Sequence, residues 1–220
     1  MLTTFTVFSC PPGTGWWALR QMSSARPLLR GAAGLRFWRL LGTGRRFGDV
    51  TPDLRRHALL GVWDDEAAAE AFLRDSAYVA GWRARAARRV TSFLRTLGST
   101  GAWDGERPFG ASTGKPATGP VAVLTRATVR PLRQLAFWRQ ASAVDRALRG
   151  AGGLRFALPV GELPLHRSGT FTIWDDAQAI ARFVGCEAHR TAMAARREQS
   201  WYREELFARF AVERSEEGDA

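Results

Sequence analysis

Residues 30–37 read RGAAGLRF and residues 149–156 read RGAGGLRF, and this pair of segments decides the fold. Further along each copy, WDDEAAAEAF at 63–72 is matched by WDDAQAIARF at 174–183. The two pairs occur in the same order and with similar spacing, so we infer a tandem duplication. A solenoid needs about three or more repeats. Two copies therefore predict a closed, pseudo-symmetric pair.

Both copies contain the same order of predicted elements. Short β-branched segments bounded by Pro or Gly predict strands, and apolar residues at helical spacing predict helices. The aspartates of each WDD suit a helix N-terminus through capping and through their charge near the helix dipole. The predicted strands are 3–9, 35–41, 57–63 and 91–97, then 121–128, 154–160, 170–174 and 206–213; the first helix of each copy is 16–29 or 132–148, and the second follows the WDD.

The resulting order, β-α-β-β-α-β, is the ferredoxin-like arrangement. We therefore predict an α+β protein whose two tandem ferredoxin-like repeats pack as an intramolecular α+β barrel. Residues 1–97 form the first half and residues 120–212 the second. Residues 98–119, rich in Gly, Ser, Thr and Pro, are expected to form a linker loop. Residues 213–220 are polar, and we expect a disordered tail there.

Composition narrows the class of protein. The net charge of +11 comes almost entirely from arginine, because Lys115 is the only lysine. These arginines are scattered, which argues against nucleic-acid binding, whereas attraction to an anionic lipid surface is at least as plausible. Cys10 and Cys186 are too few for a disulfide framework. No apolar run approaches the roughly 20 residues of a membrane span, and no leader pattern is present. We expect a cytoplasmic protein with peripheral contact at the inner face of the membrane.

Several segments carry a resemblance to a known family. They are LRFWRLLGTG at 35–44 leading into FGDVTP, ALLGVWDDE at 58–66, WDGERPF at 103–109, VLTRATVR at 123–130 and HRTAMAARREQSWYREELFARF at 189–210. With these motifs the chain resembles the spheroidene monooxygenases, which modify carotenoids. The resemblance implies insertion of oxygen into a carotenoid or related apolar isoprenoid, with haem as the cofactor and a reduced donor such as ferredoxin.

Two other functions stay open from the residues alone. One is a cofactor-free monooxygenase of the antibiotic-biosynthesis type, and the other is a non-catalytic binder of haem or an apolar ligand. Oxygen insertion at an unactivated carbon needs a cofactor or a redox-active substrate, because side chains do not activate O₂. The sequence has no GxGxxG after a first strand, no CxxC and no HExxH. Haem, by contrast, needs only one axial ligand from the protein.

His189 is the predicted ligand of the haem iron. It lies on the helix after the second WDD, and Met193 one turn later would offer an apolar floor for a flat ring. Arg196 nearby could pair with a haem propionate. The duplication places His189 opposite Tyr78, so only one copy would carry the ligand. A partly exposed helix residue is the alternative interpretation of His189.

Other candidates come from the strands. His57 shares a face with Leu59 and Trp63 and would be catalytic, on the distal side of the haem or as its ligand, if that face lines the cavity. Arg126 lies inside an apolar strand, so when buried it must meet a carboxylate or a propionate, and we count it as a candidate catalytic residue. Trp38 is expected to pack in the core or to wall the cofactor. We also predict that His166 lies in a loop and that Trp201 packs in the core. Residues 42–44 are expected to form a loop, and residues 204–205 to lie on the solvated face of a helix.

Overall fold

The computed structural model describes residues 1–48, 51–112, 114–163, 167–199 and 201–218, and the side chains of these except 163 and 196–199. The first copy of the repeat contains four strands and four helices within this description. They are β1 (Leu2–Ser9), α1 (Gly15–Ser24), α2 (Arg26–Arg30), β2 (Leu35–Gly44), β3 (Pro52–Trp63), α3 (Glu66–Asp75), α4 (Ala77–Arg83) and β4 (Arg88–Gly101). The predicted helix 16–29 is therefore divided into α1 and α2.

The second copy follows the same course. Its elements are β5 (Val121–Val129), the 3₁₀ turn η1 (Pro131–Arg133), α5 (Gln134–Arg149), β6 (Leu154–Leu163), β7 (Arg167–Trp174), α6 (Ala177–Val184), α7 (Glu187–Gln199) and β8 (Tyr202–Gly218). His166 lies outside the described residues. Residues 42–44 belong to strand β2 rather than to a loop, and residues 204–205 belong to strand β8 rather than to a helix.

The WDD motifs start helices as predicted. Asp65 caps α3 by accepting a hydrogen bond from the Ala68 N–H at 2.9 Å, and Asp176 caps α6 in the same way from Ala179 at 2.7 Å. A side-chain oxygen at this position satisfies one of the free N–H groups of the first helical turn. The same turn is therefore built twice from the same residues.

The glycine of each GLRF motif makes that turn possible. Gly34 has φ +72° and Gly153 has φ +86°, a left-handed conformation that costs glycine little. A Cβ on either one would lie 2.6 Å from the Cβ of the alanine below it, Ala68 or Ala179. The duplication read from the sequence is thus repeated in the backbone geometry.

The sheet corrects the predicted fold class. All eight strands join one closed antiparallel barrel in the order β1-β3-β2-β6-β7-β5-β8-β4, so the prediction of two ferredoxin-like sheets packed face to face was wrong. The backbone N–H and C=O groups at a sheet edge need partners. Here β4 pairs with β8 from Arg89 to Gly101, and β2 pairs with β6 at Gly42 and Thr43, so the edges of the two copies close on each other.

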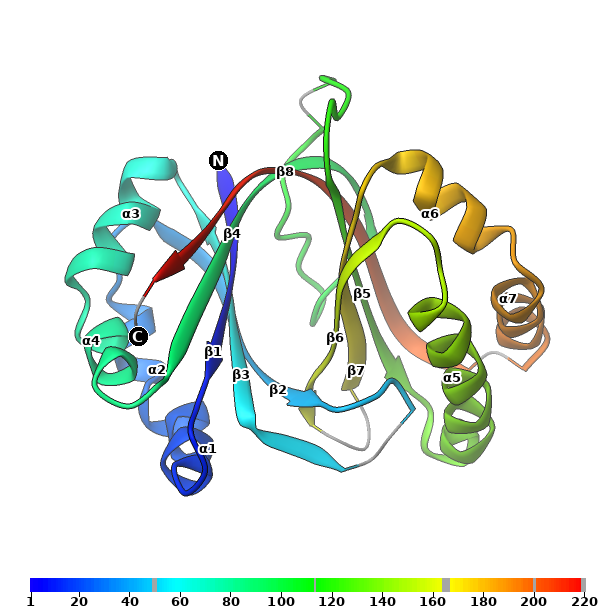
Figure 1. Cartoon of the computed structure of the whole chain (residues 1–220), viewed down its shortest axis with the longest axis horizontal. Helices are drawn as coiled ribbons and strands as arrows, with labels where there is room; N and C mark the ends of the chain where they lie inside the picture. Colours follow the sequence, from blue (N-terminus) through cyan, green and yellow to red (C-terminus); the bar gives the residue numbers. More distant parts are fainter. Residues whose placement is uncertain (49–50, 113, 164–166, 200, 219–220) are drawn as a thin grey trace.

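This closure also corrects two predicted boundaries. Strand β4 continues to Gly101 and so includes the first four residues of the predicted linker, 98–101. Strand β8 continues to Gly218, where Gly218 lies opposite Arg89. Residues 213–218 are therefore strand rather than a disordered tail, because the long β4 offers them a partner. Figure 1 shows β4 and β8 crossing together over the barrel.

Helices cover two sides of the barrel. In Figure 1, α1 to α4 lie on one side and α5 to α7 on the other, and the two additional views agree. Apolar side chains form a core inside the barrel, a second core of fifteen buried residues under α1 to α4, and two smaller clusters of four buried residues each under α5 to α7. The two helix layers are therefore packed unequally. Within the described residues, no helix is both long enough and apolar enough to cross a membrane.

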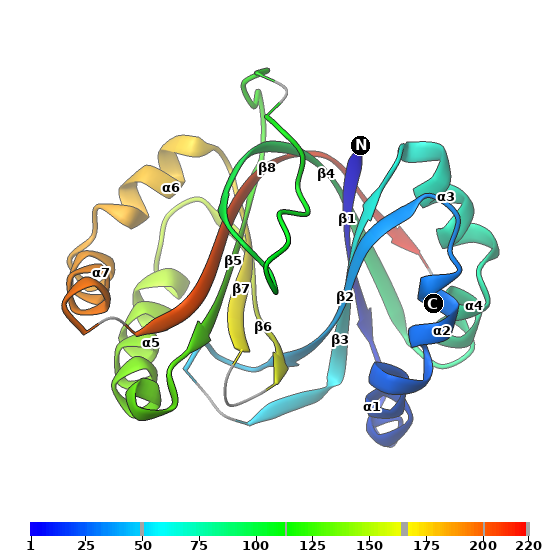
Figure 2. The same ribbon diagram turned by 180° about the vertical axis from the view of Figure 1, so that it is seen from behind.

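The linker folds back onto the barrel, as Figure 2 shows for the segment after β4. Trp103 and Phe109 of this segment are buried among the side chains of the barrel interior. Phe109 meets the ring of Phe210 edge-on, with 5.0 Å between ring centroids. The first part of the predicted linker loop is thus a component of the interior core.

Candidate functional site

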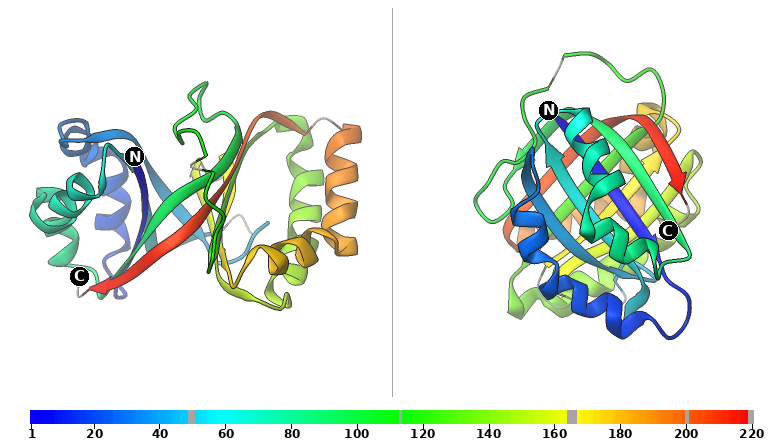
Figure 3. Two further views of the ribbon diagram at one scale, coloured as in Figure 1. Left: turned by 90° about the horizontal axis from the view of Figure 1, so that it is seen from above. Right: turned by 90° about the vertical axis from the view of Figure 1, so that its left-hand side faces the viewer.

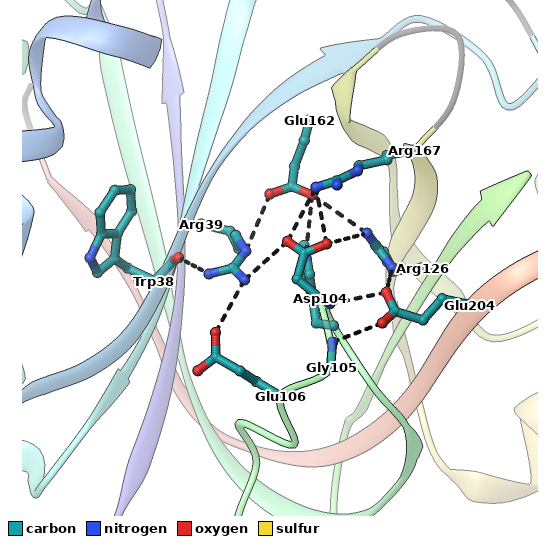
Figure 4. A network of polar contacts seen from close by, with 10 residues as sticks. Trp38, Arg39, Asp104, Gly105, Glu106, Arg126, Glu162, Arg167 and Glu204 are labelled. Carbon is teal, nitrogen blue, oxygen red and sulfur yellow. Dashed lines mark hydrogen bonds and ion pairs between the residues drawn. The ribbon is translucent and has the colours of Figure 1, made fainter.

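Arg126 lies inside the barrel, where the sequence predicts that it must find a carboxylate. It shares the inward face of β5 with Ala122 and Leu124, and only 4% of it is exposed. Its guanidinium pairs with Glu204 of β8, lies 3.2 Å from an oxygen of Asp104 and 3.8 Å from an oxygen of Glu162. The partners come from the linker and from two other strands, so only the closed barrel assembles them (Figure 4).

Two further arginines complete this interior charge cluster. Arg167 of β7 reaches Asp104 at 3.1 Å and Glu162 at 3.2 Å. Arg39 of β2 lies 3.3 Å from Asp104 and 3.2 Å from Glu162. Asp104 and Glu162 thus each face three guanidinium groups, which offsets the cost of holding charges away from water. We call Arg39, Asp104, Glu106, Arg126, Glu162, Arg167 and Glu204 the interior charge cluster.

Glu204 is held in its charged form. Burial favours the neutral acid, but the N–H groups of Gly105 and Asp104 and the Arg126 guanidinium outweigh it and lower the pKa of Glu204 below its ordinary value. The Asp104 and Gly105 N–H groups donate at 3.0 and 2.9 Å. Asp104 has φ +53°, and this left-handed turn aims both N–H groups at the carboxylate. Glu204 therefore fastens the linker to the barrel.

A cavity of about 90 Å³ opens beside this cluster. It lies between α5, the β2–β3 hairpin and the ends of β6 and β7. Its walls are aromatic and small side chains with an arginine at each side, namely Gly42, Thr43, Gly44, Arg46, Phe47, Gly48, Thr51, Pro52, Phe137, Trp138, Pro159, Val160, Gly161, Arg167, Ser168 and Gly169. A smaller pocket shares Val160, Gly161 and Arg167 with it and reaches Arg126 and Trp103. Arg167 thus connects the surface cavity to the interior charge cluster.

His189 lies in the first turn of α7, half-buried at the edge of the second helix layer. Its ring meets Phe183 edge-on with 5.2 Å between centroids. Its Nδ1 is buried and has no hydrogen-bond partner. Burial lowers the pKa of His189 more than its hydrogen bond to the Val184 backbone raises it, so the imidazole is neutral at pH 7. A neutral imidazole is the form that binds a metal.

Met193 and Arg196 lie on the same helix as His189. Met193 is half-buried one turn further along α7, as its spacing predicts. The Arg196 side chain lies outside the described side chains, so its predicted pairing with a propionate stays a prediction. Neither His189 nor Met193 is among the residues that line the 90 Å³ cavity.

His57 and Trp38 lie in the first helix layer, away from His189. His57 is buried on the outward face of β3 beside Trp82, with 5.6 Å between ring centroids, while Ala58 and Leu60 face the barrel interior. The face of β3 that carries His57 therefore packs under helices. Trp38 packs in this same layer, and Arg26 lies 5.8 Å above its ring. The predicted site residues thus occupy three separate places in the fold.

Strand register shows how the two helix layers differ. Trp63 pairs with Leu2 and Trp174 pairs with Val121, so the two copies align residue by residue. On the outward face, the first copy has Phe8, Leu59 and Trp38 where the second has Ala127, Thr170 and Ala157. Phe207 stays 41% exposed, although its counterpart Thr91 is buried. The sheet face on the side of His189 is therefore built of smaller residues and is less covered.

Sequence reasoning missed most of the interior charge cluster. Arg126 inside an apolar strand was the signal that pointed to it, and the WDGERPF segment contains Asp104. Arg39, Glu162 and Arg167 gave no comparable signal, because each stands among ordinary strand residues. Trp201 is 2% exposed and packs against Phe137, so its predicted packing role is confirmed. Within the described residues, no three His, Cys, Asp or Glu side chains form a metal-binding group.

Comparison with curated proteins shows which family the chain resembles in sequence. It is 34% identical over 211 residues to a spheroidene monooxygenase of Rubrivivax gelatinosus, covering 96% of this chain and 81% of that protein. It is 32% identical over 200 residues to a spheroidene monooxygenase of Rhodobacter capsulatus, covering 89% and 83%. The chain belongs to the spheroidene monooxygenase family. The family resemblance drawn from the motifs is thus confirmed, and the chain is a monooxygenase.

Solved structures with a similar fold include aldoxime dehydratases. An aldoxime dehydratase matches with a TM-score of 0.66 at 14% identity, covering all of this chain and 84% of that one. A second aldoxime dehydratase, in complex with butyraldoxime, gives a TM-score of 0.63 at 12% identity. At such low identity the likeness concerns the fold alone. No family model matches the chain.

Proposed function

We propose that this family member is a haem-dependent monooxygenase that inserts oxygen into a carotenoid or a related apolar isoprenoid. Family membership carries the proposal, and His189 supplies the protein side of it. A half-buried, neutral imidazole with an unpartnered Nδ1 suits an axial ligand, since haem needs one such group. Haem would supply the activation of O₂ that side chains lack.

The second helix layer has the features that a flat cofactor requires. The outward sheet face carries Ala127, Thr170 and Ala157 where the first copy carries large side chains, and His189 of α7 contacts Phe183 of α6 on this side of the barrel. The nearby cavity, at about 90 Å³, is well below the roughly 300–1,000 Å³ of ligand pockets. The cavity as it stands is therefore smaller than a porphyrin needs, and neither His189 nor Met193 lines it.

The cavity lining and the family both support the proposed substrate class. Phe47, Phe137 and Trp138 provide aromatic walls, which pack well against a polyene. Arg46 and Arg167 also line the cavity. Their charged ends would stay in contact with water and would not bind an apolar ligand. These residues position the chain of the substrate and keep water from its reacting carbon.

Insertion of one oxygen atom from O₂ leaves the other atom to become water, and this consumes two electrons and two protons. An external reductant is therefore required. We propose reduced ferredoxin in this role, with the net charge of +11 on the chain favouring approach of an acidic donor protein.

The ultraviolet–visible spectrum of protein expressed with a haem precursor tests the cofactor. We expect a Soret band that is lost in His189→Ala. His57→Ala is the matched control, because His57 also has a buried Nδ1 without a partner and a pKa lowered by burial. A band that survives in His189→Ala and vanishes in His57→Ala would move the ligand to β3.

A flat spectrum at saturating haem would overturn the haem proposal altogether. Oxygen uptake by the colourless protein with an electron-rich substrate would then favour the cofactor-free monooxygenase. Turnover is measured separately, by extraction of oxygenated carotenoid from an assay that contains reduced ferredoxin.

A further inference from the structure

Large apolar side chains are exposed at the starts of two equivalent helices. Trp16 and Leu19 in α1 are 74% and 41% exposed, while Leu132 in η1 and Leu135 in α5 are 97% and 68% exposed. Helix α1 follows β1, and η1 with α5 follows β5, so the duplication brings both starts to one end of the barrel. Figure 1 and the right-hand view of Figure 3 place α1 and α5 at the same lower end. Clustered apolar exposure of this kind marks an interaction surface.

The β2–β3 hairpin joins the two apolar groups. On one side, the Cys10 N–H donates to the Arg55 carbonyl at 2.7 Å, just before α1. On the other side, the Phe47 N–H donates to Asp145 of α5 at 2.9 Å, and the Phe47 ring meets Phe137 with 5.8 Å between centroids. The hairpin therefore contacts the segment before α1 on one side and α5 on the other, and the two apolar groups lie on either side of it at this end of the barrel.

This face is basic. Its exposed arginines are Arg20, Arg45, Arg46, Arg55, Arg130, Arg133 and Arg139. Among its described residues the acidic side chains are Asp53 and Asp145, and both are buried and paired, with Arg56 at 2.9 Å and Arg149 at 2.7 Å. Acidic residues gather instead at the starts of α3 and α6, which lie toward the opposite end in Figure 1. Asp64 and Asp175 at those starts pair with Arg36 and Arg155, so what distinguishes the first face is its excess of exposed arginine.

The 90 Å³ cavity lies at the same end. Arg46, Phe47 and Pro52 of the hairpin and Phe137 and Trp138 of α5 line it. A molecule that enters from this face therefore meets the aromatic walls directly, without crossing the charged interior of the barrel.

We propose that this face, made by Trp16, Leu19, Leu132, Leu135 and the seven exposed arginines, docks on an anionic lipid bilayer. Exposed apolar side chains ringed by arginine match the acyl boundary and the anionic headgroups of such a bilayer. The proposal deepens the proposed function, since it rests on an apolar substrate that is dissolved in the bilayer and enters the cavity from there. Vesicle binding is nevertheless measured without turnover.

The test is partition of the full chain onto vesicles of phosphatidylglycerol and phosphatidylcholine, followed by flotation. We expect binding that requires phosphatidylglycerol and weakens with salt. Leu132→Ser with Leu135→Ser is expected to lower partition about tenfold or more. Arg45→Gln and Arg133→Gln are expected to lower it about fivefold each. All four side chains are exposed, so the variants keep the fold, which circular dichroism checks.

Matched controls lie on α3 and α6, outside the proposed docking face. Val184→Ser removes an apolar residue from α6 that is 45% exposed, and Arg74→Gln removes a basic residue from α3. Both are expected to bind vesicles like the parent. An equal loss in Arg74→Gln would reduce the arginine effect to net charge, and an equal loss in Val184→Ser would show that the position of the apolar side chain does not matter; either result would overturn the docking face.

Two outcomes distinguish the membrane-docking proposal from a dimer interface and from the haem proposal. No partition onto phosphatidylglycerol vesicles, with concentration-dependent dimers that the double leucine variant abolishes, would assign the face to a second copy of the chain. Vesicle binding by a protein that takes up no haem would leave the docking face intact and remove only the cofactor proposal.

Discussion

At the scale of single residues, Arg126 shows how a buried charge is held. Its guanidinium faces Glu204, Asp104 and Glu162 and is almost wholly inaccessible. Arg126→Met keeps the length of the side chain and removes its charge, which leaves Glu204 without its guanidinium partner and weakens the pairing of Asp104 and Glu162. We expect a loss of about 3–5 kcal/mol in the free energy of unfolding, measured by urea denaturation.

The control for this loss is Arg74→Met. Arg74 pairs with Asp75 at 3.0 Å, with both side chains more than 60% exposed. An exposed pair contributes about 0–1 kcal/mol. Adding Glu204→Gln to Arg126→Met should restore part of the stability, because it removes the unpaired charge. Equal effects of the Arg74 and Arg126 substitutions would contradict the account of the cluster.

Glu204 makes stability depend on pH. Its pKa is lowered in the folded protein from about 4.5, so the folded state binds this proton less readily than the unfolded chain does. Its contribution is complete above that value and is lost as the pH falls through the lower, folded pKa. Glu204→Gln should therefore show a shallower decline of the urea midpoint below about pH 4.5. An unchanged slope would mean that other carboxylates govern acid unfolding.

At the scale of elements, Gly169 shows why β5 and β7 lie so close. A Cβ at this position would stand 2.1 Å from the Thr125 carbonyl oxygen, so the backbone itself must shift. We expect Gly169→Ala to lower the free energy of unfolding by about 2 kcal/mol or more, since overpacking costs about 1–3 kcal/mol. Thermal unfolding followed by circular dichroism measures the change.

Gly98→Ala is the matched control, because a Cβ there would meet nothing within 4 Å. Gly98 also stands in a strand, so both substitutions change backbone entropy alike. We expect Gly98→Ala to leave the melting temperature unchanged or slightly raised. A similar fall for both variants would show that the close approach at Gly169 can relax.

At the scale of the whole molecule, closure of the barrel predicts one cooperative unit. Each copy alone would expose the edges of β2 and β4 or of β6 and β8, which pair only with the other copy. Tryptophan fluorescence and far-ultraviolet circular dichroism should therefore give coincident urea transitions. Two separated transitions would show that the halves unfold independently, as two packed domains would.

Local features were open to prediction from the sequence. The paired RGA-GLRF and WDD segments predicted the repeat and the helix starts at Asp65 and Asp176, because caps depend on residues a few positions apart. The motifs of the family are contiguous as well, and similarity to its members confirms them. His189 was predicted on the helix that follows the second WDD, whereas that helix, α6, ends at Val184 and His189 lies on the separate helix α7; its role as a haem ligand stays a prediction.

The amino-acid sequence by itself thus determined the duplication, the order of strands and helices in each copy, and the family. Only the tertiary structure decided that the two sheets close into one barrel, that Trp103 and Phe109 fill its interior, and that Arg126 meets Asp104 and Glu204. The physical reason is that edge pairing uses backbone groups common to every residue. Ion pairs between residues as far apart as Arg126 and Glu204 leave no periodic trace in the chain, so their partners are fixed only when the barrel closes.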